Sequence, residues 1–569
     1  MLTEIRRRYP NMPSIWGEGA IFGFSGIDGE TSSATGFVAT YARQPYSLLF
    51  QTPTRRALDF LLKDPGEMRI AVGDVLAAET PNGVFLAAFT AWHTLIGVLP
   101  IDTVTMLSTE DGKEAVRDGV YWVSEDVGAP DALVGVQRGL RFVVSYGSDV
   151  AEAKRRADET IEFDAYLVAE HRLAAYENLP RLEDPGNDCL LKKCFSVMKV
   201  NTLAREDVIR QRWSTPDRVP HKDMWLWDSV FHSLAMDRFL PQVAWEDLKS
   251  VLDTQNPDGF IPHQSSVSGR QSSVTQPPLL AWGVWENYQA LSDKSCLAYA
   301  LPKLEAYLEW NLENRDQNGN GLLEWKIDES ARCRCGESGL DNSPRFDRGV
   351  PLDSVDFSSI QAHDMEHVAR IASELGDEAK AKAWSEKSEE LAGKVHAELW
   401  DEDDGIYYDR DLDGNFEGVQ AVSGFFPLML PDMPEGRAER LVEALNDPER
   451  FNAAFPVPTV AVSDPNYSTD MWRGCTWANT NYLVIHGLRR QGQKEEADRL
   501  AAKTIQFVRQ YYEQCGVLFE FFDSSDESPP FVCDRKGRCE PPYDIRKKVQ
   551  CIRDYHWTAA VTALLLLGT

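Results

Sequence analysis

"MWLWDSVFHSLAMDRF", residues 224–239, and "VAWEDLKSVLDTQ", residues 243–255, are consecutive helical patterns of opposite character. The first is apolar and aromatic on nearly every side, which is typical of a helix buried all round. The second carries Glu, Asp and Lys on one face, which is typical of a helix that is partly exposed to solvent. Roughly a dozen helical segments over residues 187–569 alternate in this way. The alternation predicts an inner ring of buried helices wrapped by an outer ring, an (α/α)6 barrel.

The first part of the chain has a different texture. From about Ser32 to Tyr146, short runs alternate apolar and polar residues and are separated by turn residues. They predict an antiparallel β-sandwich over residues 1–150. A charged helical stretch at 151–186 is predicted to link this domain to a barrel over 187–569. The expected fold class is therefore α+β multidomain, with an N-terminal antiparallel β-sandwich followed by a C-terminal (α/α)6 barrel.

Composition excludes several classes of partner. The 569 residues are 43% hydrophobic and carry a net charge of −30, with a pI near 4.8. Nucleic acids and anionic membranes need a basic surface, so neither is an expected partner. The N-terminus lacks the apolar core of a signal peptide, and the longest apolar run, at the C-terminus, is too short to span a bilayer. The sequence thus predicts a cytoplasmic protein whose oligomeric state is unknown.

Two cysteine pairs stand out among the ten cysteines, which are too sparse for a disulfide scaffold. They are Cys333 with Cys335 in "RCRCG", and Cys533 with Cys539 in "VCDRKGRC". Four thiolates suit a structural zinc, but the spacing is unlike that of a zinc knuckle. A redox-sensitive disulfide and unrelated loop cysteines are the alternatives.

The loops between the predicted helices share a composition rich in Trp, Asp, Gly and Pro. Tryptophans beside carboxylates and amides suit a sugar site, because the indole packs on the apolar face of a pyranose while polar groups bind its hydroxyls. The alternative is that these tryptophans are core aromatics on inner helices. The loops in question contain the segments "HKDMWLWDSVFH", "NPDGFIPHQ", "SVTQPPLLAW", "GESGLDNSPRFD", "STDMWRGCTWANTNY" and "GVLFEFFDSSD".

Five of these segments, in order, resemble glycoside hydrolase family 63. They are "WLWDSVFH", "TQPPLLAW", "ESGLDNSPRFD", "WRGCTWANTNY" and "FEFFD". The likeness is to the bacterial mannosylglycerate and glucosylglycerate hydrolases and α-glucosidases, and more distantly to trehalases of the same clan. It covers roughly residues 190–569. The N-terminal part is similar, on weaker grounds, to the sandwich domain of the longer family members.

The resemblance implies an inverting glycosidase with two catalytic carboxyl groups. It implies Asp341 of "SGLDNSPR" as the general acid and Glu520 of "EFFD" as the general base. Such a reaction needs one protonated carboxyl to release the leaving oxygen and one carboxylate to activate water, about 6.5–9.5 Å apart. The stiff turn after Asp341 is suited to aim it, and the apolar neighbours of Glu520 are expected to desolvate it. Glu337 and Asp347 are alternative candidates for the acid.

The same resemblance implies a set of substrate-binding residues. Asp228 and Gln276 are expected to bind hydroxyls of the terminal sugar, and Trp225 to stack near it. The complete set is Trp225, Asp228, Gln276, Gly339, Trp472 and Trp477. Met471, where the short glycerate-glycoside hydrolases tend to carry an aromatic, puts glycerate as the aglycone in doubt. Arg473 is expected to support a carboxylate rather than to touch substrate.

A loop in "NRDQNGNGLLEW" predicts a structural calcium site. Asp316, Asn318 and Asn320 stand at alternate positions, as oxygen donors do in calcium loops, but Ile327 occupies the place of the bidentate Glu of an EF-hand. A helix-to-helix turn without an ion is the alternative. No cofactor is expected to be required for the reaction.

The function predicted is hydrolysis of a terminal α-linked glucosyl or mannosyl residue of a small glycoside or oligosaccharide. The alternatives are a trehalase-like hydrolase, a sugar phosphorylase, a polysaccharide lyase and a non-catalytic carbohydrate-binding protein on the same barrel. A phosphorylase would replace Glu520 by a phosphate site, and a lyase would need basic groups for uronates. The only expected partner is a small-molecule carbohydrate.

Overall fold

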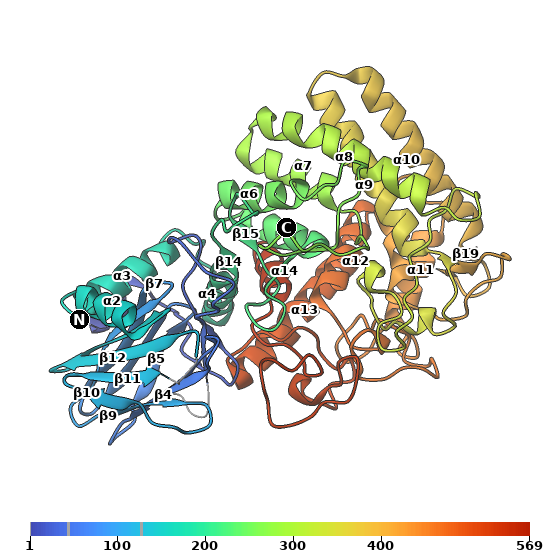
Figure 1. Ribbon diagram of the computed structural model, residues 1–569. Helices are drawn as coiled ribbons and strands as arrows, with labels where there is room; N and C mark the ends of the chain where they lie inside the picture. Colours follow the sequence, from blue (N-terminus) through green and yellow to red (C-terminus); the bar gives the residue numbers. More distant parts are fainter. Residues whose placement is uncertain (1, 42–45, 126–128, 569) are drawn as a thin grey trace. The chain divides into compact units, whose positions relative to one another are not determined.

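The computed structural model describes residues 2–41, 46–125 and 129–568 (Figure 1). Its contacts divide the chain into two compact units, which are described separately. Unit 1 comprises Met1–Lys222 with Arg509–Leu518 and Arg553–Ala559. Unit 2 comprises Asp223–Val508, Phe519–Ile552 and Ala560–Thr569.

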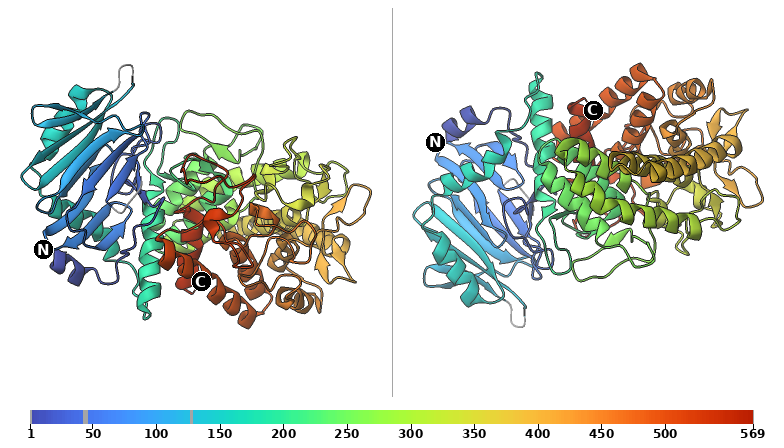
Figure 2. Two further views of the ribbon diagram at one scale, coloured as in Figure 1. Left: turned by 90° about the horizontal axis from the view of Figure 1, so that it is seen from below. Right: turned by 90° about the horizontal axis from the view of Figure 1, so that it is seen from above.

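Two antiparallel sheets form the sandwich of unit 1, which confirms the predicted β-sandwich (Figures 1 and 2). The sheets face each other through aromatic side chains: Phe60 of β4 packs 5.1 Å from Phe85 of β7 and 5.0 Å from Phe142 of β13, between ring centroids. The five-stranded sheet has the order β1(Ile21–Phe22), β2(Ala39–Tyr41), β3(Ser47–Phe50), β4(Arg56–Leu61) and β9(Val104–Thr109). The eight-stranded sheet has the order β10(Val116–Asp118), β11(Tyr121–Glu125), β12(Ala132–Arg138), β13(Arg141–Gly147), β8(Thr94–Val98), β7(Gly83–Ala91), β6(Val75–Thr80) and β5(Glu67–Val72).

The stretch predicted as a helical linker packs on the sandwich instead. Helices α2(Val150–Thr160) and α3(Ala165–Leu173) contact strands of the eight-stranded sheet. Asp149 and Asp164 cap them by accepting backbone N–H groups, and the small apolar residues on one face are buried, which lets the helices lie close to the sheet. This stretch is therefore part of unit 1 and not a spacer.

Helix α4(Pro185–Val200) lies beyond the predicted domain boundary near residue 186 but belongs to unit 1, which extends to residue 222. The Lys199 ammonium lies 2.5 Å from Asp74 of the turn between β5 and β6. One turn earlier on the helix, Ser196 Oγ accepts the N–H of Gly73 at 2.6 Å. Buried ion pairs of this kind are costly to separate, so the first helix of the helical region belongs with the sandwich.

The helices that follow confirm the barrel. The inner ring is largely buried, although α7 is buried mainly over its first half. Its members are α5(Leu226–Met236), α7(Leu280–Leu291), α9(Val355–Glu374), the 3₁₀ segment η4(Val422–Met429), α12(Ala478–Arg490) and α14(His556–Leu566). Successive members contact each other in the order α5, α7, α9, η4 and α12. The outer helices have one exposed face: α6(Pro241–Leu252), α8(Lys294–Asn314), α10(Glu378–Glu398), α11(Arg437–Asn446) and α13(Lys494–Cys515).

One inner member is not the α-helix that its sequence predicts. Residues 418–430 read as an apolar helix, yet η4 is a 3₁₀ segment with Pro427 inside it. Proline lacks the N–H that an α-helical hydrogen bond needs. A Cβ at Gly424 would lie 2.7 Å from the carbonyl oxygen of Tyr407, so the close approach requires glycine.

Short elements complete the chain and the loops. They are α1(Leu2–Arg8), η1(Ala174–Tyr176), β14(Thr202–Leu203) paired with β15(Trp213–Ser214), β16(Met224–Trp225) paired with β17(Gln264–Ser265), β18(Leu352–Asp353) paired with β21(Arg410–Asp411), and β19(Trp400–Asp401) paired with β20(Ile406–Tyr407). The 3₁₀ segments η2(Gly336–Ser338), η3(Pro344–Phe346), η5(Met471–Arg473) and η6(Pro530–Val532) lie in loops.

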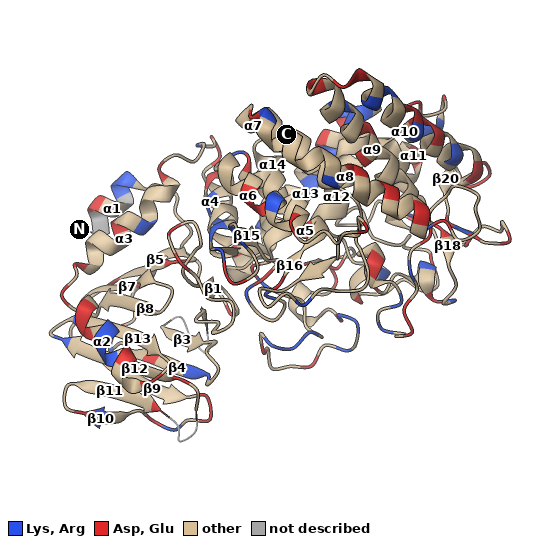
Figure 3. Ribbon diagram, turned by 45° about the horizontal axis from the view of Figure 1, so that its top comes forward, with Lys and Arg blue, Asp and Glu red and all other residues tan. Residues whose placement is uncertain are grey.

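Charged residues cover the outer helices. Lys residues are interspersed with Glu residues along α10 in Figure 3, so acidic residues are not segregated on this helix. In the part of the chain that the structure describes, none of the helices is both long and apolar enough to cross a bilayer.

Buried histidines make the folded state sensitive to acid, and His367 of α9 gives a specific prediction. Burial lowers the pKa of His367 to about 3. An unfolded histidine has a pKa of about 6.5, so the stability that this group contributes is present above pH 6.5 and is lost as the pH falls toward 3. The variant His367→Gln has no such loss. We expect the stability advantage of the wild type over this variant to shrink by about 2 kcal/mol between pH 7 and pH 5. Denaturant unfolding at the two pH values measures it, and a constant difference would contradict it.

Candidate active site

The beginning of α5 gathers four of the predicted binding residues. Trp225 ends strand β16 and is followed by the helix, whose first turn contains the buried Asp228. Gln276 is also buried, and its Oε1 accepts the backbone N–H of Trp227 at 3.2 Å. Gly339 lies against the indole of Trp227, where an added Cβ would come within 2.5 Å of the ring, and its φ of +73° also favours glycine. The structure therefore brings Trp225, Asp228, Gln276 and Gly339 together.

Gly339 leads directly to Asp341. The loop turns through η2, and Cys335 donates its backbone N–H to the carbonyl oxygen of Asp341 at 3.1 Å. The ring of His263 lies 5.0 Å from that of Trp225, between ring centroids, and His263 interacts electrostatically with Asp341. Burial lowers the pKa of His263. The Asp341 side chain itself is 19% exposed, so it is accessible while its backbone is held.

The two alternative acids of this loop have structural roles. Glu337 is fully buried, and its carboxylate accepts two hydrogen bonds from Arg315, at 3.0 and 2.7 Å, and the backbone N–H groups of Thr275 and Lys326. Asp347 is paired with Arg473 through two hydrogen bonds of 2.8 and 2.7 Å. The hydrogen bonds of Glu337 are thus used to hold the loop, and Asp347 pairs with Arg473 at the surface. Asp341 as the general acid stays a prediction. Arg473 supports a carboxylate, as expected.

The segment 468–477 joins the loop of Asp341 to the rest of the site. Asn342 accepts the N–H of Trp472 at 3.0 Å and donates to the carbonyl oxygen of Asp470 at 3.2 Å. Trp472 and Trp477 are stacked, with ring centroids 3.6 Å apart, and their exposed fractions are 1% and 0%. Trp477 also packs against Phe521, with ring centroids 4.9 Å apart. A direct contact of Trp472 with sugar stays a prediction.

Glu520 lies in an extended segment that pairs with this one. Thr476 and Phe522 exchange backbone hydrogen bonds of 2.8 and 3.0 Å, and the N–H of Glu520 donates to the carbonyl oxygen of Ile552 at 2.9 Å, so the backbone on both sides of the segment is held. The Glu520 carboxylate is 1% exposed and accepts two hydrogen bonds from Arg535, from Nε at 2.7 Å and from Nη2 at 2.9 Å. The N–H of Ile552 adds a third, at 3.3 Å. A bidentate contact of this kind with a guanidinium fixes the orientation of the carboxyl group.

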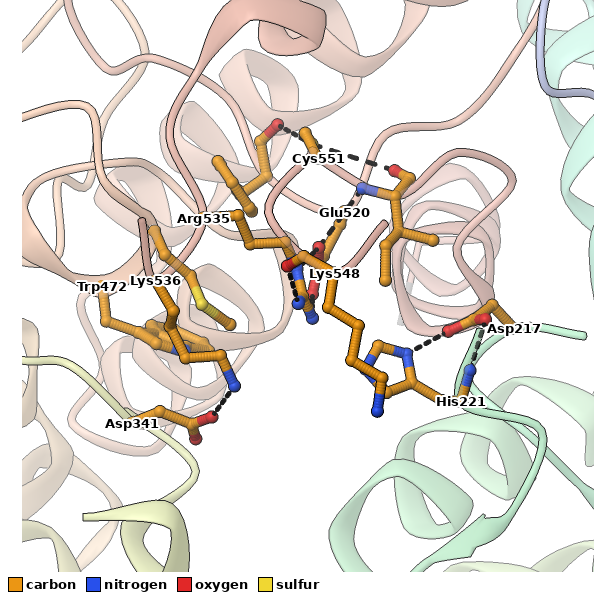
Figure 4. A network of polar contacts seen from close by, with 12 residues as sticks. Asp217, His221, Asp341, Trp472, Glu520, Arg535, Lys536, Lys548 and Cys551 are labelled. Atoms are coloured by element: carbon orange, nitrogen blue, oxygen red, sulfur yellow. Dashed lines mark hydrogen bonds and ion pairs between the residues drawn. The ribbon is translucent and has the colours of Figure 1, made fainter. Parts of the chain in front are cut away.

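Asp341 forms an ion pair with Lys536, the residue that follows Arg535. The ammonium of Lys536 lies 2.6 Å from Asp341 Oδ2. Figure 4 shows the Arg535 side chain reaching Glu520 and the Lys536 side chain diverging from it to reach Asp341. Two carboxylates that are 179 positions apart in the sequence are thus contacted by one dipeptide.

Sequence reasoning missed both cations of this dipeptide. They lie in "VCDRKGRC", a segment that was interpreted only through its two cysteines, as a possible part of a zinc site or disulfide. No local pattern in the sequence links these basic residues to either carboxyl group. The apolar sequence around Glu520 suggested desolvation, but the side chain that decides its environment comes from a separate loop.

The cysteines of the two pairs do not meet. Each of Cys335, Cys533 and Cys539 directs its Sγ to a different backbone carbonyl, of Lys326, Pro529 and Phe531 respectively. No disulfide joins any two of the ten cysteines. Across the described residues, no group of three or more His, Cys, Asp or Glu side chains is arranged to hold a metal ion. The interpretation as unrelated loop cysteines is the one that the geometry favours.

The predicted calcium loop is rich in oxygen donors. Asp353, which faces it, accepts hydrogen bonds from the side-chain amides of Asn318, at 3.1 Å, and Asn320, at 2.8 Å, while Asp316 accepts the N–H of Gly321. Burial and the charges of Asp353 and Asp316 raise the pKa of Glu324, which completes the cluster, to about 7. Hard oxygen donors suit calcium, but both amides present N–H groups to Asp353. The calcium site stays a prediction.

An (α/α)6 barrel whose loops carry carboxyl, amide and tryptophan side chains suits a protein that binds and hydrolyses glycosides. A comparison with family models agrees: residues 220–558 match the mannosylglycerate hydrolase MGH1-like glycoside hydrolase domain. The chain belongs to this family, of the glycoside hydrolase family 63 type, and is a glycosidase.

The chain covers most of the length of some curated relatives and about half of the length of another. A mannosylglycerate hydrolase of Thermus thermophilus is 27% identical over 396 residues, covering 53% of this chain and 92% of the relative. Mannosylglycerate hydrolase MGH1 of Selaginella moellendorffii is 23% identical, covering 58% and 82%. An uncharacterised protein of Borreliella burgdorferi is 26% identical, and the chain spans about half of it, 53%.

Solved structures support the fold of both parts. The family 63 mannosylglycerate hydrolase of Thermus thermophilus in complex with glucose has a TM-score of 0.53 at 23% identity and covers 67% of this chain and all of the other. A bacterial glucoamylase in complex with acarbose has a TM-score of 0.59 at 11% identity and covers 98% of this chain and 96% of the other. The match to the glucoamylase includes the sandwich of this chain. The match to the mannosylglycerate hydrolase covers only two thirds of this chain, although it uses the whole of the other structure.

Proposed function

We propose that this protein is an inverting glycosidase that removes a terminal α-linked glucosyl or mannosyl residue from a small glycoside or oligosaccharide. Asp341 is the general acid and Glu520 the general base. The observation that carries the proposal is that these two carboxyl groups, and neither Glu337 nor Asp347, lie on either side of the Arg535–Lys536 dipeptide.

The roles follow from what each carboxyl group contacts. Glu520 accepts from Arg535 at both oxygens and is held as a carboxylate, the form that takes a proton from water. Asp341 is partly exposed, so a glycosidic oxygen can approach it. In an inverting reaction Asp341 gives its proton to the leaving oxygen while Glu520 removes one from the attacking water, on opposite faces of the ring.

The terminal sugar is assigned to the cluster at the start of α5. Asp228 supplies hydroxyl acceptors, Gln276 orients the helix start, and Trp225 offers an indole for stacking. Relatives named as mannosylglycerate hydrolases favour mannose or glucose with a small aglycone. A relative named trehalase, 26% identical over 363 residues, keeps a trehalase-like hydrolase as the second candidate. No cofactor is required by this chemistry, and the calcium of the 316–324 loop would be structural.

Proton NMR of the products tests the proposal. Purified protein is incubated with α-linked glucosides, α-linked mannosides, trehalose and glycerate glycosides, and the first anomer released is recorded before mutarotation. We expect hydrolysis of at least one α-glycoside with the β-anomer appearing first. An α-anomer appearing first would contradict inversion, and no hydrolysis across the set would contradict the glycosidase proposal for these substrates.

A further inference from the structure

The loop that begins at Cys533 contacts both reacting carboxyl groups, and its two contacts differ in kind. Arg535 is buried, and besides Glu520 it donates from Nη1 to the carbonyl oxygen of Lys548 at 2.8 Å. Its guanidinium is therefore held from two sides. The Lys536 side chain is 25% exposed, and its ammonium ends on Asp341 at 2.6 Å. One cation is fixed, and the other is at the end of a flexible, partly solvated stem.

The backbone of this dipeptide is anchored independently of the two side chains. The N–H of Lys536 donates to Asp470 Oδ1 at 2.7 Å, and the N–H of Arg535 donates to the carbonyl oxygen of Gly537 at 3.0 Å. Lys536 has a φ of +51°, a conformation that such anchoring sustains. The Lys536 side chain can consequently leave Asp341 without moving Arg535 from Glu520.

The ion pair of Lys536 conflicts with the role of Asp341. A carboxyl group that contacts an ammonium at 2.6 Å is a carboxylate, and a carboxylate has no proton to give to a leaving oxygen. The other titratable groups near Asp341 do not replace this charge: burial raises the pKa of Cys333 to about 12 and lowers that of His263, so both are neutral near pH 7.

We propose that Lys536 is a displaceable counter-ion of the general acid. It holds Asp341 as a carboxylate before substrate binds and is displaced by the sugar, whereas Arg535 holds Glu520 as a carboxylate throughout. On displacement Asp341 takes one proton from solvent. In the reaction that proton goes to the leaving oxygen and Glu520 takes one from water, and after product release Glu520 returns a proton to solvent and Lys536 pairs with Asp341 again.

The inference rests on the proposed function, and pH profiles of Lys536→Met test it. The profile of kcat/KM reports the free enzyme, and that of kcat reports the enzyme–substrate complex. We expect the alkaline limb of kcat/KM to move to higher pH in Lys536→Met, because a positive charge beside a carboxyl group is removed, and the alkaline limb of kcat to stay in place. Lys536→Arg, which keeps the charge, should retain the wild-type limb, and unchanged thermal unfolding verifies the fold of both variants.

Two outcomes overturn the inference. Superimposed kcat/KM profiles for wild type and Lys536→Met would show that Lys536 does not control Asp341. An equal shift in both profiles would show that Lys536 stays paired in the complex, and it would then be a permanent partner rather than a displaceable one.

A binding measurement separates this inference from the proposed function. Glucose and mannose are titrated into the wild type and into Lys536→Met in buffers of different ionisation enthalpy, which reveals proton uptake without turnover. We expect the wild type to take up a larger fraction of a proton per bound sugar than the variant. Binding without a difference in uptake overturns the role of Lys536 alone, whereas the absence of both sugar binding and hydrolysis would count against the proposed function.

Discussion

Replacing Glu520 by Gln is expected to lower kcat by roughly 10²–10⁴-fold while binding of the released sugar is retained, because the amide cannot take a proton from water. Replacing Asp341 by Asn is expected to have a loss of similar size, for the opposite reason that the amide cannot donate to a leaving oxygen. Both substitutions preserve shape, so the stacked and hydrogen-bonded groups at the start of α5 should still bind sugar. Steady-state kinetics and calorimetric titration of glucose or mannose measure the two effects.

Matched controls exist for both substitutions. Asp347→Asn changes an exposed aspartate of the same loop as Asp341, and Glu527→Gln changes an exposed glutamate a few residues after Glu520. Both controls should retain most of the activity. Turnover at the wild-type level in Glu520→Gln or Asp341→Asn would remove that residue from the mechanism, and a loss of sugar binding with the turnover would point to a structural role.

Replacing Arg345 by Met is expected to destabilise unit 2 by about 3–5 kcal/mol, the usual cost of removing one member of a buried ion network. Arg345 lies at the end of the Asp341 loop, with its guanidinium 2.6 Å from Asp356 and 2.8 Å from Asp409. All three side chains are buried. Without Arg345, two carboxylates of the α9 region would remain buried and unpaired with a cation. Denaturant unfolding at pH 8 measures the loss, and a change below about 1 kcal/mol would contradict the role assigned to the network.

The effect of this substitution should depend on pH in a defined direction. Burial raises the pKa of Asp409 to about 6, against the lowering effect of Arg345. In the variant that opposing charge is gone, so the carboxyl group binds a proton more readily and pays less for its burial in acid. The destabilisation is therefore expected to be smaller at pH 5 than at pH 8. Arg348→Met, three residues further on and exposed, is the matched control, since exposed pairs contribute only about 0–1 kcal/mol.

Local patterns in the sequence were sufficient for the architecture. Alternation of period two predicted the strands of the sandwich, and alternation of apolar and amphipathic helices predicted the barrel, because periodicity reports directly which face of an element is buried. The same logic failed where a neighbour decides. Residues 151–186 were predicted to be a helical linker, but the small residues of α2 and α3 pack on a sheet. Residues 418–430 were predicted to be a helix, but Pro427 and the close contact at Gly424 make a 3₁₀ segment.

The site divides in the same way. Asp341, Glu520 and the residues at the start of α5 were predicted from segments that resemble family motifs and from the aromatic and acidic loop residues that are typical of sugar sites, and their roles stay predictions. The partners of the two carboxyl groups were not recognised, since Arg535 and Lys536 come from a loop that has no periodicity and no motif. The pairing of each basic side chain with a particular carboxyl group depends on how the fold places segments that are distant in sequence. No local sequence pattern encodes that placement. The tertiary structure alone assigned Arg535 to Glu520 and Lys536 to Asp341, because ion pairs form between groups that folding brings together and not between groups that are near in sequence.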